Sequence, residues 1–391
     1  MGAVSTVHDF DLITVADLRK RGGLNWSLYP GALGSFVAEM DYGCASEIIE
    51  ALHAGMDDLR FGYLPPVLVG EMAQACAGWL AESYGWQVTA ADIRPVADVI
   101  AGLQIAIESF SRPGSAIVVP TPAYKHFLDV PLRSGRKVVE VPMVLVEDRW
   151  EFDLDALDQA CAAGAGLMIL CSPYNPLGRV FSNAELRAVS EVVERHGLRV
   201  FADEIHCPVV FNGATHIPYA TVSPAASAHT ITALSASKAW NLAGLKCAQV
   251  VLSNDADRET WTGLGMAAEI GTSNPGLIAH AAAYRRAGPW LHDVLGYLDR
   301  NRIRLSELVA QLLPGVVYRP PEGTYLAWLD CTALDLGDRP GSFFADHARV
   351  VFTEGVDCGD AGRGCVRLNL ATPQPILDEI VDRMAKALAQ R

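Results

Sequence analysis

Five short apolar runs, separated by amphipathic stretches, constrain the fold of this chain more than any other feature. They span residues 115–120, 166–171, 198–202, 229–234 and 247–252. Each run has the length of a buried strand, and the segments between them have helical spacing. Residues 183–196 are an example: Ser182 and Glu185 form a capping box at the start, and Gly197 ends the segment. Strands that alternate with helices predict an α/β fold with a mostly parallel sheet.

The last hundred residues follow a different pattern. A long helical period covers 289–313, a pair of strands is expected around 318–329, and a closing helix covers 375–389. This pattern predicts a second, smaller α+β lobe. We therefore expect three parts, which are an N-terminal arm that joins the small lobe (1–50), a large cofactor-binding domain (51–288) and a small C-terminal domain (289–391).

Composition excludes several classes of partner. The 391 residues are 50% hydrophobic, and the formal charge of -14 argues against attraction to nucleic acid or an anionic membrane. No apolar run approaches the ~18 residues that a membrane span needs. The nine cysteines form no C-x-x-C pair, which favours reduced thiols in a cytoplasm. The first six residues fit the N-myristoylation pattern, but so few positions are specified that chance explains the match better.

Lys238 lies in the segment Ser235-Ala-Ser-Lys-Ala-Trp-Asn-Leu-Ala-Gly-Leu-Lys246, just after an apolar run. A lysine between a hydroxyl and a second cation is typical of a lysine that binds pyridoxal 5′-phosphate (PLP). The aldehyde of PLP needs a primary amine for its Schiff base, and its phosphate needs small donors and a positive charge. We expect Lys238 to bind the aldehyde, and Ser235 and Lys246 to hold the phosphate. No metal is expected.

Other runs end near groups that a PLP site needs, and ligands of open α/β sheets bind beyond the carboxyl ends of the strands. Asp203, preferred over Glu204, would keep the pyridine nitrogen protonated, so that the ring can accept negative charge from the substrate Cα. Asn175, in a turn between prolines, can donate to the phenolic oxygen, and Tyr124 can stack on the ring. Each residue also has a purely structural alternative: Asp203 could cap a turn, Asn175 could only shape its turn, and Tyr124 could pack in the core.

Two further features of the sequence predict binding sites for anionic groups. A helix over 103–110 is expected to open with Ala101-Gly102-Leu103-Gln104, and free N–H groups at a helix start bind phosphate. We therefore include Gly102, Leu103 and Gln104 in the phosphate site. Arg367 lies within an apolar strand of the small lobe, where a buried guanidinium needs a partner. A bidentate substrate α-carboxylate fits that need, and a structural ion pair is the alternative.

The order of Asn175, Asp203, Lys238 and Arg367 resembles fold-type I PLP enzymes of the class I/II aminotransferase superfamily. The likeness is greatest to its cystathionine β-lyase (C-S lyase) branch and extends from near residue 36 to the end. The shared phrases are Phe36-Val-Ala-Glu-Met-Asp41, Gly62-Tyr63, Ala202-Asp-Glu-Ile-His206, Ser235-Ala-Ser-Lys-Ala-Trp-Asn-Leu-Ala-Gly-Leu245, Gly323-Thr-Tyr-Leu-Ala-Trp-Leu-Asp330 and Val366-Arg-Leu-Asn-Leu-Ala371.

The resemblance implies a homodimer with active sites at the subunit interface, where Tyr63 reaches the phosphate of the partner subunit's cofactor. It also places His206 near the phenolic oxygen, although a structural histidine beside a strand is an equal alternative. The activity implied is β-elimination from cystathionine or another S-substituted L-cysteine. As the general base, Lys238 would remove the Cα proton, a thiolate would leave Cβ, and pyruvate and ammonia would form.

Three departures from the branch are expected to face the substrate. The chain has Glu39 and Tyr174 where the branch usually has aspartate and histidine, and Asn25-Trp26-Ser27 where it usually has Lys-Trp-Asp. Two alternatives with the same cofactor therefore stay open. One is an aminotransferase, and the other is a natural-product tailoring enzyme that acts on an S-conjugated cysteine, such as an S-glycosyl cysteine, by elimination or by decarboxylation with deamination.

Two alternatives come from other classes of protein. Ser235 and Lys238 match the S-x-x-K pattern of penicillin-binding proteins and β-lactamases, but the K-T-G and S-D-N partners are missing from the sequence. A DNA-binding regulator with a PLP-type domain would need a basic extension, which the acidic chain lacks. We expect instead an enzyme whose partners are an amino-acid substrate and a second copy of itself.

Overall fold

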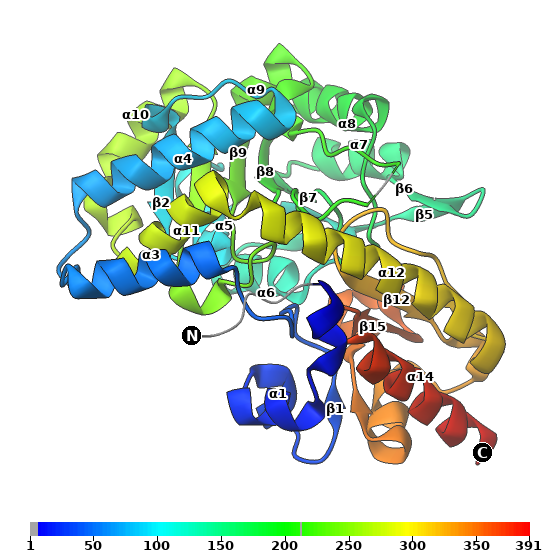
Figure 1. Ribbon diagram of the computed structural model, residues 1–391. Helices are drawn as coiled ribbons and strands as arrows, with labels where there is room; N and C mark the ends of the chain where they lie inside the picture. The colour runs from blue at the N-terminus through cyan, green and yellow to red at the C-terminus, as the bar shows by residue number, and fades with distance from the viewer. Residues whose placement is uncertain (1–6, 212) are drawn as a thin grey trace.

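The computed structural model of the chain describes residues 7–211 and 213–391, in two lobes (Figure 1). The myristoylation-like hexapeptide lies outside the described residues. Within them, the larger lobe is built on a seven-stranded sheet with the order β2-β10-β9-β8-β7-β3-β4. Its strands are β2 (Ile93–Val96), β3 (Ile117–Thr121), β4 (Val138–Pro142), β7 (Leu167–Cys171), β8 (Arg199–Asp203), β9 (Thr230–Leu234) and β10 (Ala248–Leu252).

The sheet is mostly parallel, as the sequence predicted. Strands β4, β3, β7, β8 and β9 pair in parallel, whereas β10 is antiparallel to both of its neighbours, β9 and β2. Because β10 is reversed, its first residues lie at the same edge of the sheet as the last residues of β9. This reversal brings Lys246 to the edge that carries Lys238.

Helices cover the large sheet, and strands β3, β7, β9 and β10 are buried along their whole length, as expected for a sheet covered on both faces. The helices are α3 (Ser46–Asp57), α4 (Pro66–Tyr84), α5 (Val99–Ser109), α6 (Lys125–Arg133), α7 (Leu154–Ala162), α8 (Asn183–His196), α9 (Pro224–His229), α10 (Asp255–Leu264) and α11 (Asn274–Arg286). A hairpin of β5 (Val144–Val146) and β6 (Arg149–Glu151) projects from this lobe (Figure 1).

In the part of the chain that the structure describes, no helix has the length and apolarity that a membrane crossing would require.

Helix α8 shows how local sequence sets an element's ends. Its bounds are those that the sequence predicted, 183–196. The Ser182 hydroxyl accepts a hydrogen bond from the Glu185 N–H group, and the Glu185 carboxylate accepts one from the Ser182 N–H group. Gly197 ends the helix at a φ of 62°, in the left-handed region that favours glycine.

The smaller lobe contains, in its described part, a four-stranded antiparallel sheet with the order β11-β12-β15-β14. The long helix α12 runs from the larger lobe across this sheet, and α14 lies beside it (Figure 1). The elements are α12 (Gly288–Leu312), β11 (Val317–Tyr318), β12 (Leu326–Asp330), α13 (Pro340–Phe343), β13 (Val350–Val351), β14 (Thr353–Glu354), β15 (Cys365–Asn369) and α14 (Gln374–Ala389).

The N-terminal segment joins the smaller lobe. It contains α1 (Val15–Arg21), α2 (Leu24–Ser27) and β1 (Leu33–Gly34). Strand β1 pairs in parallel with β13, so that Leu33 lies opposite Val350. Figure 1 accordingly shows the blue start of the chain beside the orange and red C-terminal elements. The arm continues from β1 between the two lobes before α3 begins.

We expect Gly34→Ala to destabilise the arm, because an alanine Cβ there would lie 1.9 Å from the backbone oxygen of Asn25. The expected loss is about 1–3 kcal/mol of unfolding free energy. Gly78→Ala is the matched control. It lies within α4 with open space around it, so the change should be neutral or stabilise by ~0.5–1 kcal/mol. Chemical denaturation measures both, and equal unfolding midpoints would contradict the close approach.

Candidate functional site

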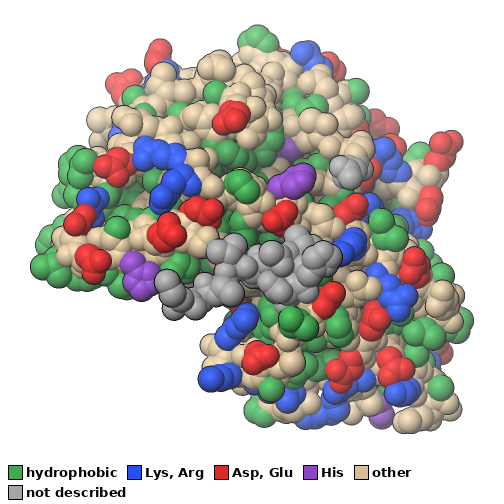
Figure 2. Space-filling view, in the orientation of Figure 1, with side chains coloured by type: hydrophobic (Ala, Val, Ile, Leu, Met, Phe, Trp, Pro, Cys, Tyr) green, Lys and Arg blue, Asp and Glu red, His purple; other side chains and the backbone are tan. Residues whose placement is uncertain are grey.

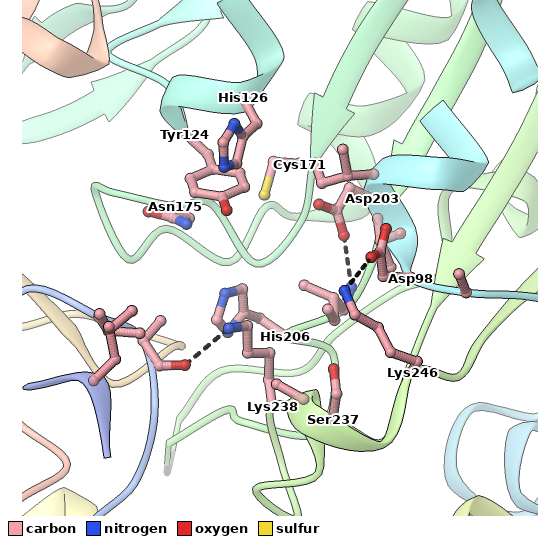
Figure 3. A pocket seen from close by; sticks show the side chains of 18 of the residues that line it. Asp98, Tyr124, His126, Cys171, Asn175, Asp203, His206, Ser237, Lys238 and Lys246 are labelled. Carbon is pink, nitrogen blue, oxygen red and sulfur yellow. Dashed lines mark hydrogen bonds and ion pairs between the residues drawn. The ribbon is translucent and has the colours of Figure 1, made fainter. Parts of the chain in front are cut away.

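A cavity of about 530 Å³ lies at the carboxyl edge of the parallel strands, between the two lobes. Most of the polar residues that the sequence predicted for the site line it, and they come from different elements (Figure 3). These residues are Tyr124 after β3, Asn175 after β7, Asp203 at the end of β8, His206 after β8, Lys238 after β9, Lys246 before β10 and Arg367 in β15. The edge of the sheet therefore gathers residues that are far apart in sequence, as in other open α/β folds.

Lys238 points into the cavity and donates a hydrogen bond from Nζ to the backbone oxygen of Ala38 at 2.8 Å (Figure 3). Burial and, to a smaller extent, the positive charge of Arg367 lower the pKa of Lys238 to about 8, against the opposing charges of Glu39 and Asp203. An amine with this pKa is partly neutral near physiological pH. Lys238 can therefore act as a nucleophile toward an aldehyde and as a base toward carbon.

Asp203 and Glu204 point to opposite sides of the end of β8. Asp203 lines the cavity and accepts one hydrogen bond, from the Ile205 N–H group at 3.0 Å. Burial raises the pKa of Asp203 to about 7, so a cationic partner would be needed to keep it ionised. Glu204 is buried away from the cavity, where it accepts from the Tyr219 N–H group at 2.7 Å and pairs with His216 at 3.2 Å. Only Asp203 can therefore meet a ligand in this cavity.

Arg367 is a buried cation without an acidic partner in the described part of the chain. Its guanidinium donates to Asn175 Oδ1 at 3.1 Å, to the Phe36 backbone oxygen at 2.8 Å and to the Thr353 hydroxyl at 3.1 Å, and its Nε has no partner. Burial lowers the pKa of Arg367. A desolvated guanidinium that faces a cavity is a strong site for a carboxylate. The structure therefore does not support a structural ion pair.

The remaining polar groups at the centre of the cavity are neutral. Because Asn175 Oδ1 accepts from Arg367, its amide nitrogen is left as a donor. Burial raises the pKa of Tyr124 to about 12 and lowers the pKa of His206 to about 3. The Tyr124 ring meets Phe127 edge to face at 5.5 Å, which fixes its orientation. These residues can hydrogen-bond or stack with an aromatic ligand without adding charge.

The donors at the other end of the cavity suit a phosphate. Helix α5 begins at Val99, and the free N–H groups of Val99 and Ile100 lie at the cavity wall. Its N-cap residue Asp98 accepts from the Ala101 N–H group at 2.8 Å and forms an ion pair with Lys246 at 2.9 Å (Figure 3). A helix start beside a lysine offers the backbone donors and the positive charge that a phosphate needs.

Two predictions for the phosphate end were wrong. The helix starts four residues before Leu103, so Gly102, Leu103 and Gln104 lie within it and not at its start; the Gly102 N–H group already donates to the Asp98 backbone oxygen at 3.1 Å. Gln104 instead bonds Glu108 on the outer face of the helix.

Ser235 is the second correction, because its side chain does not line the cavity. Its hydroxyl donates to the Cys247 backbone oxygen at 2.8 Å and accepts from the Ser237 N–H group at 3.1 Å. Ser237 lines the cavity in its place. The engaged hydroxyl of Ser235 also removes the S-x-x-K alternative, in which that serine would be a nucleophile.

The arm forms one wall of the cavity, and its backbone is tied to both lobes. The carbonyl groups of residues 36–40 all accept hydrogen bonds from side chains. The Ala38 carbonyl also accepts from the Tyr325 hydroxyl at 3.1 Å. Asn241 of the large lobe bonds both the N–H and the carbonyl of Met40, and Asn369 of the small lobe bonds the carbonyls on either side of Ala38. These amides fix the carbonyl that holds Lys238.

Two of the residues that depart from the family pattern, Tyr174 and Asn25, are buried and do not line the cavity. Tyr174 was expected to face the substrate, and this is wrong, because the side chain is buried in the core and its hydroxyl donates to the Pro120 backbone oxygen at 2.7 Å. Asn25 is also buried, and its Oδ1 accepts from the N–H groups of Phe36 and Val37. Asn25 therefore shapes the arm without lining the cavity.

Sequence reasoning missed several lining residues. Asp98, Val99 and Ile100 were missed because β2 before them is only four residues long and contains a proline, so it did not look like an apolar run. The aspartate followed by a helical pattern was a usable N-cap signal. Cys171 and His126 also line the cavity, and nothing in the sequence distinguished them from core or surface residues.

Tyr63 does not line this cavity. It lies between α3 and α4 with 93% of its surface exposed. The role that the resemblance gave it requires a second subunit, so that role stays a prediction.

Comparisons with known proteins agree with this geometry. Residues 37–384 match the family described as aminotransferase class I and II. A cystathionine β-lyase of Corynebacterium glutamicum is 36% identical over 373 residues, which cover 95% of this chain and 98% of that protein. Cystalysin from Treponema denticola, whose crystal structure contains PLP, has a TM-score of 0.91 at 26% identity, over 100% of this chain and 99% of that one. The PLP-bound C-S lyase of Staphylococcus hominis has a TM-score of 0.90 at 26% identity, over 98% and 99%.

In the apoprotein, we expect amine labelling of Lys238 to rise through an inflection near pH 8, because its pKa is lowered to about 8 and the neutral amine is the reactive form. Arg367→Gln removes a nearby positive charge and should move the inflection to higher pH. The exposed Arg363→Gln is the matched control and should leave it unchanged. Mass spectrometry of the labelled peptide gives the rate at each pH. An inflection that does not move in Arg367→Gln would contradict the charge coupling.

Proposed function

Because the chain belongs to the aminotransferase class I and II family, we propose that it is a PLP-dependent carbon–sulfur lyase of fold type I. It cleaves cystathionine or another S-substituted L-cysteine by β-elimination and releases a thiol, pyruvate and ammonia. One observation carries the proposal: the Lys238 amine, the Asp203 carboxylate and the Arg367 guanidinium, which has no acidic partner among the described residues, converge on one cavity. The relatives described as cystathionine β-lyase and C-S lyase support the choice of bond.

The residues of the cavity fit PLP. The phosphate would be held by the N–H groups of Val99 and Ile100, by Ser237 and by Lys246, while Asp203 would receive the pyridine N–H group. A cation beside Asp203 would compensate the burial that raises its pKa to about 7. When bound, PLP supplies an aldehyde that reacts with an amine and a protonated ring that accepts negative charge.

The chain's own residues would perform the remaining steps. Arg367 binds the α-carboxylate of the substrate and so fixes the orientation of its Cα–H bond. The neutral amine of Lys238 removes the Cα proton, and the Ala38 carbonyl, to which the Tyr325 hydroxyl also donates, accepts from the ammonium that results. The bond from Cβ to sulfur then breaks, and the electron pair leaves with the thiolate. Hydrolysis of the three-carbon fragment gives pyruvate and ammonia.

Transamination is the second candidate, since the matching family is described as aminotransferases. It uses the same lysine and the same carboxylate clamp, so the cavity serves both reactions. The need for a keto acid acceptor separates the two.

We also propose a homodimer in which Tyr63 reaches the partner's cofactor. Large apolar side chains are exposed on the turn between α3 and α4 that carries Tyr63, at the start of α4 and on the segment after α10. They are Leu59, Phe61, Val67, Met266 and Ile270. Figure 2 shows hydrophobic side chains at the left edge, where the turn between α3 and α4 lies in Figure 1. Asn274 of α11 bonds the backbone of Arg60 and Gly62 and so fixes this turn. A fixed apolar surface of this kind suits a second copy of the chain.

All nine cysteines are free thiols, and most are buried. This state supports a reducing compartment, and we propose the cytoplasm as the location.

We expect Lys238→Ala to lower pyruvate formation from L-cystathionine by about 10²–10⁴-fold, because the general base is lost. The assay measures pyruvate and free thiol, with and without an added keto acid. Lys125→Ala, on the exposed side of α6, is the control and should keep full activity. Pyruvate formed only with the keto acid would favour transamination, and undiminished turnover by Lys238→Ala would exclude that lysine as the base.

We expect activity to return when inactive Lys238→Ala and Tyr63→Ala subunits are mixed and allowed to exchange. If each site combines Lys238 of one subunit with Tyr63 of its partner, the mixed dimer contains one site in which both residues are intact. Pyruvate formation after subunit exchange, compared with each variant alone, measures the recovery, and sedimentation confirms the dimer. No recovery despite exchange would show that the two residues do not form a shared site.

A further inference from the structure

We propose that the group carried on the sulfur of the substrate is uncharged and apolar, and that Leu24, Phe36 and Val37 of the arm bind it. This inference rests on the proposed function and narrows its substrates to S-alkyl and S-aryl L-cysteines. The three side chains line the same cavity as Lys238 and Arg367. None of the three has a role in the PLP binding proposed above.

The charged groups of the cavity already have tasks. Lys246 pairs with Asp98 at the phosphate end, Asp203 faces the pyridine, and Arg367 is left for the α-carboxylate. His126 also lines the cavity, and burial lowers its pKa, which favours the neutral imidazole. Among the described residues that line the cavity, no charged side chain is left to form an ion pair with a charged group on the sulfur substituent.

The arm presents its side chains, and not its backbone groups, to the substrate. The Phe36 carbonyl is bound by Arg367, the Val37 carbonyl by two amide side chains, and the Ala38 carbonyl by Lys238. The N–H groups of Phe36 and Val37 both donate to the Asn25 side chain. A ligand that approaches this wall therefore meets apolar side chains whose backbone is already hydrogen-bonded.

The apolar surface continues outward from the cavity. Leu24 of α2 lines the cavity, yet 47% of its surface is exposed. The Tyr29 ring packs edge to face on Phe36 at 5.4 Å between ring centres. A substituent longer than a methyl group could therefore stay in apolar contact as it extends toward solvent.

The distal end of cystathionine has different requirements, because it carries both an ammonium and a carboxylate. The groups that could meet them, Arg21, Glu39 and Asp41, do not line the cavity but an adjoining hollow of about 250 Å³, which shares Ala243 with it. Two of these groups are already engaged: Arg21 donates to the Asp41 backbone oxygen at 2.9 Å, and the Asp41 carboxylate accepts from the Trp26 indole at 2.7 Å. The wall formed by Leu24, Phe36 and Val37 has no such groups to offer.

The first test compares S-benzyl-L-cysteine, S-methyl-L-cysteine and L-cystathionine with the holoenzyme. We expect kcat/KM for pyruvate formation from the benzyl compound to exceed that of each of the others by at least about tenfold. Leu24→Ser should remove most of the advantage over the methyl compound while changing the methyl compound by less than about twofold. Leu12→Ser, at a leucine outside the cavity that is more exposed than Leu24, is the control and should change neither.

The second test measures binding without turnover. The compound 3-(benzylsulfanyl)propanoate keeps the carboxylate and the sulfur substituent but lacks the amine. Calorimetry with the holoenzyme should show it binding at least about tenfold more tightly than 3-(methylsulfanyl)propanoate, with the difference lost in Leu24→Ser.

The outcomes separate this inference from the proposed reaction. If no cysteine conjugate gives pyruvate, the proposed elimination is wrong, and the calorimetry alone decides whether the apolar wall binds the substituent. If cystathionine is preferred and Glu39→Gln abolishes the preference, the charged hollow recognises the substrate and the inference is overturned. Equal binding of the two propanoates would also overturn it.

Discussion

The hydrogen bonds from two cations to the backbone of the N-terminal arm are the interaction on which the site depends. Lys238 of the large lobe bonds the Ala38 carbonyl, and Arg367 of the small lobe bonds the Phe36 carbonyl, two residues away on the same segment. The arm thus connects the lobes where the proposed chemistry takes place. Because a carbonyl is neutral, it holds each cation in place and leaves its charge available to a ligand.

This arrangement leaves the charges of the cavity out of balance. Two cations lie close enough for Arg367 to lower the pKa of Lys238, and the pKa of Asp203 is raised to about 7 by burial. An anion at Arg367 and a cation at Asp203 would compensate both desolvated groups. The substrate carboxylate and the pyridinium of PLP are such a pair, so the cavity is already organised for the ligands that we propose.

The sequence predicted the central residues of this cavity by a simple rule, that ligands meet the carboxyl ends of parallel strands. The rule found Tyr124, Asn175, Asp203 and Lys238, because each follows an apolar run that was easy to recognise. It failed at the phosphate end, where β2 reads Ile93-Arg-Pro-Val96 and was not recognised as a strand. The helix after it was consequently started four residues too late.

Other errors came from side-chain direction, which the order of residues does not give. Ser235 and Ser237 are equally plausible as phosphate donors in the sequence, yet the first bonds backbone and the second faces the cavity. Tyr174 lies one residue before Asn175 and points into the core. Neighbouring residues of a strand or turn diverge, so a shift of one position exchanges a site residue for a core residue.

The sequence by itself determined the mostly parallel sheet and the placing of Lys238 and Asp203, the proposed cofactor lysine and its carboxylate partner, at the edge of that sheet, because these depend on local apolar patterning and on which residues end each strand. The tertiary structure decided what surrounds them. Only the folded chain brings the carbonyls of residues 36–40 against Lys238 and Arg367, which lie some 200 to 330 positions away in sequence. Contacts over such separations arise from the packing of two lobes around an arm, and no local pattern encodes that packing.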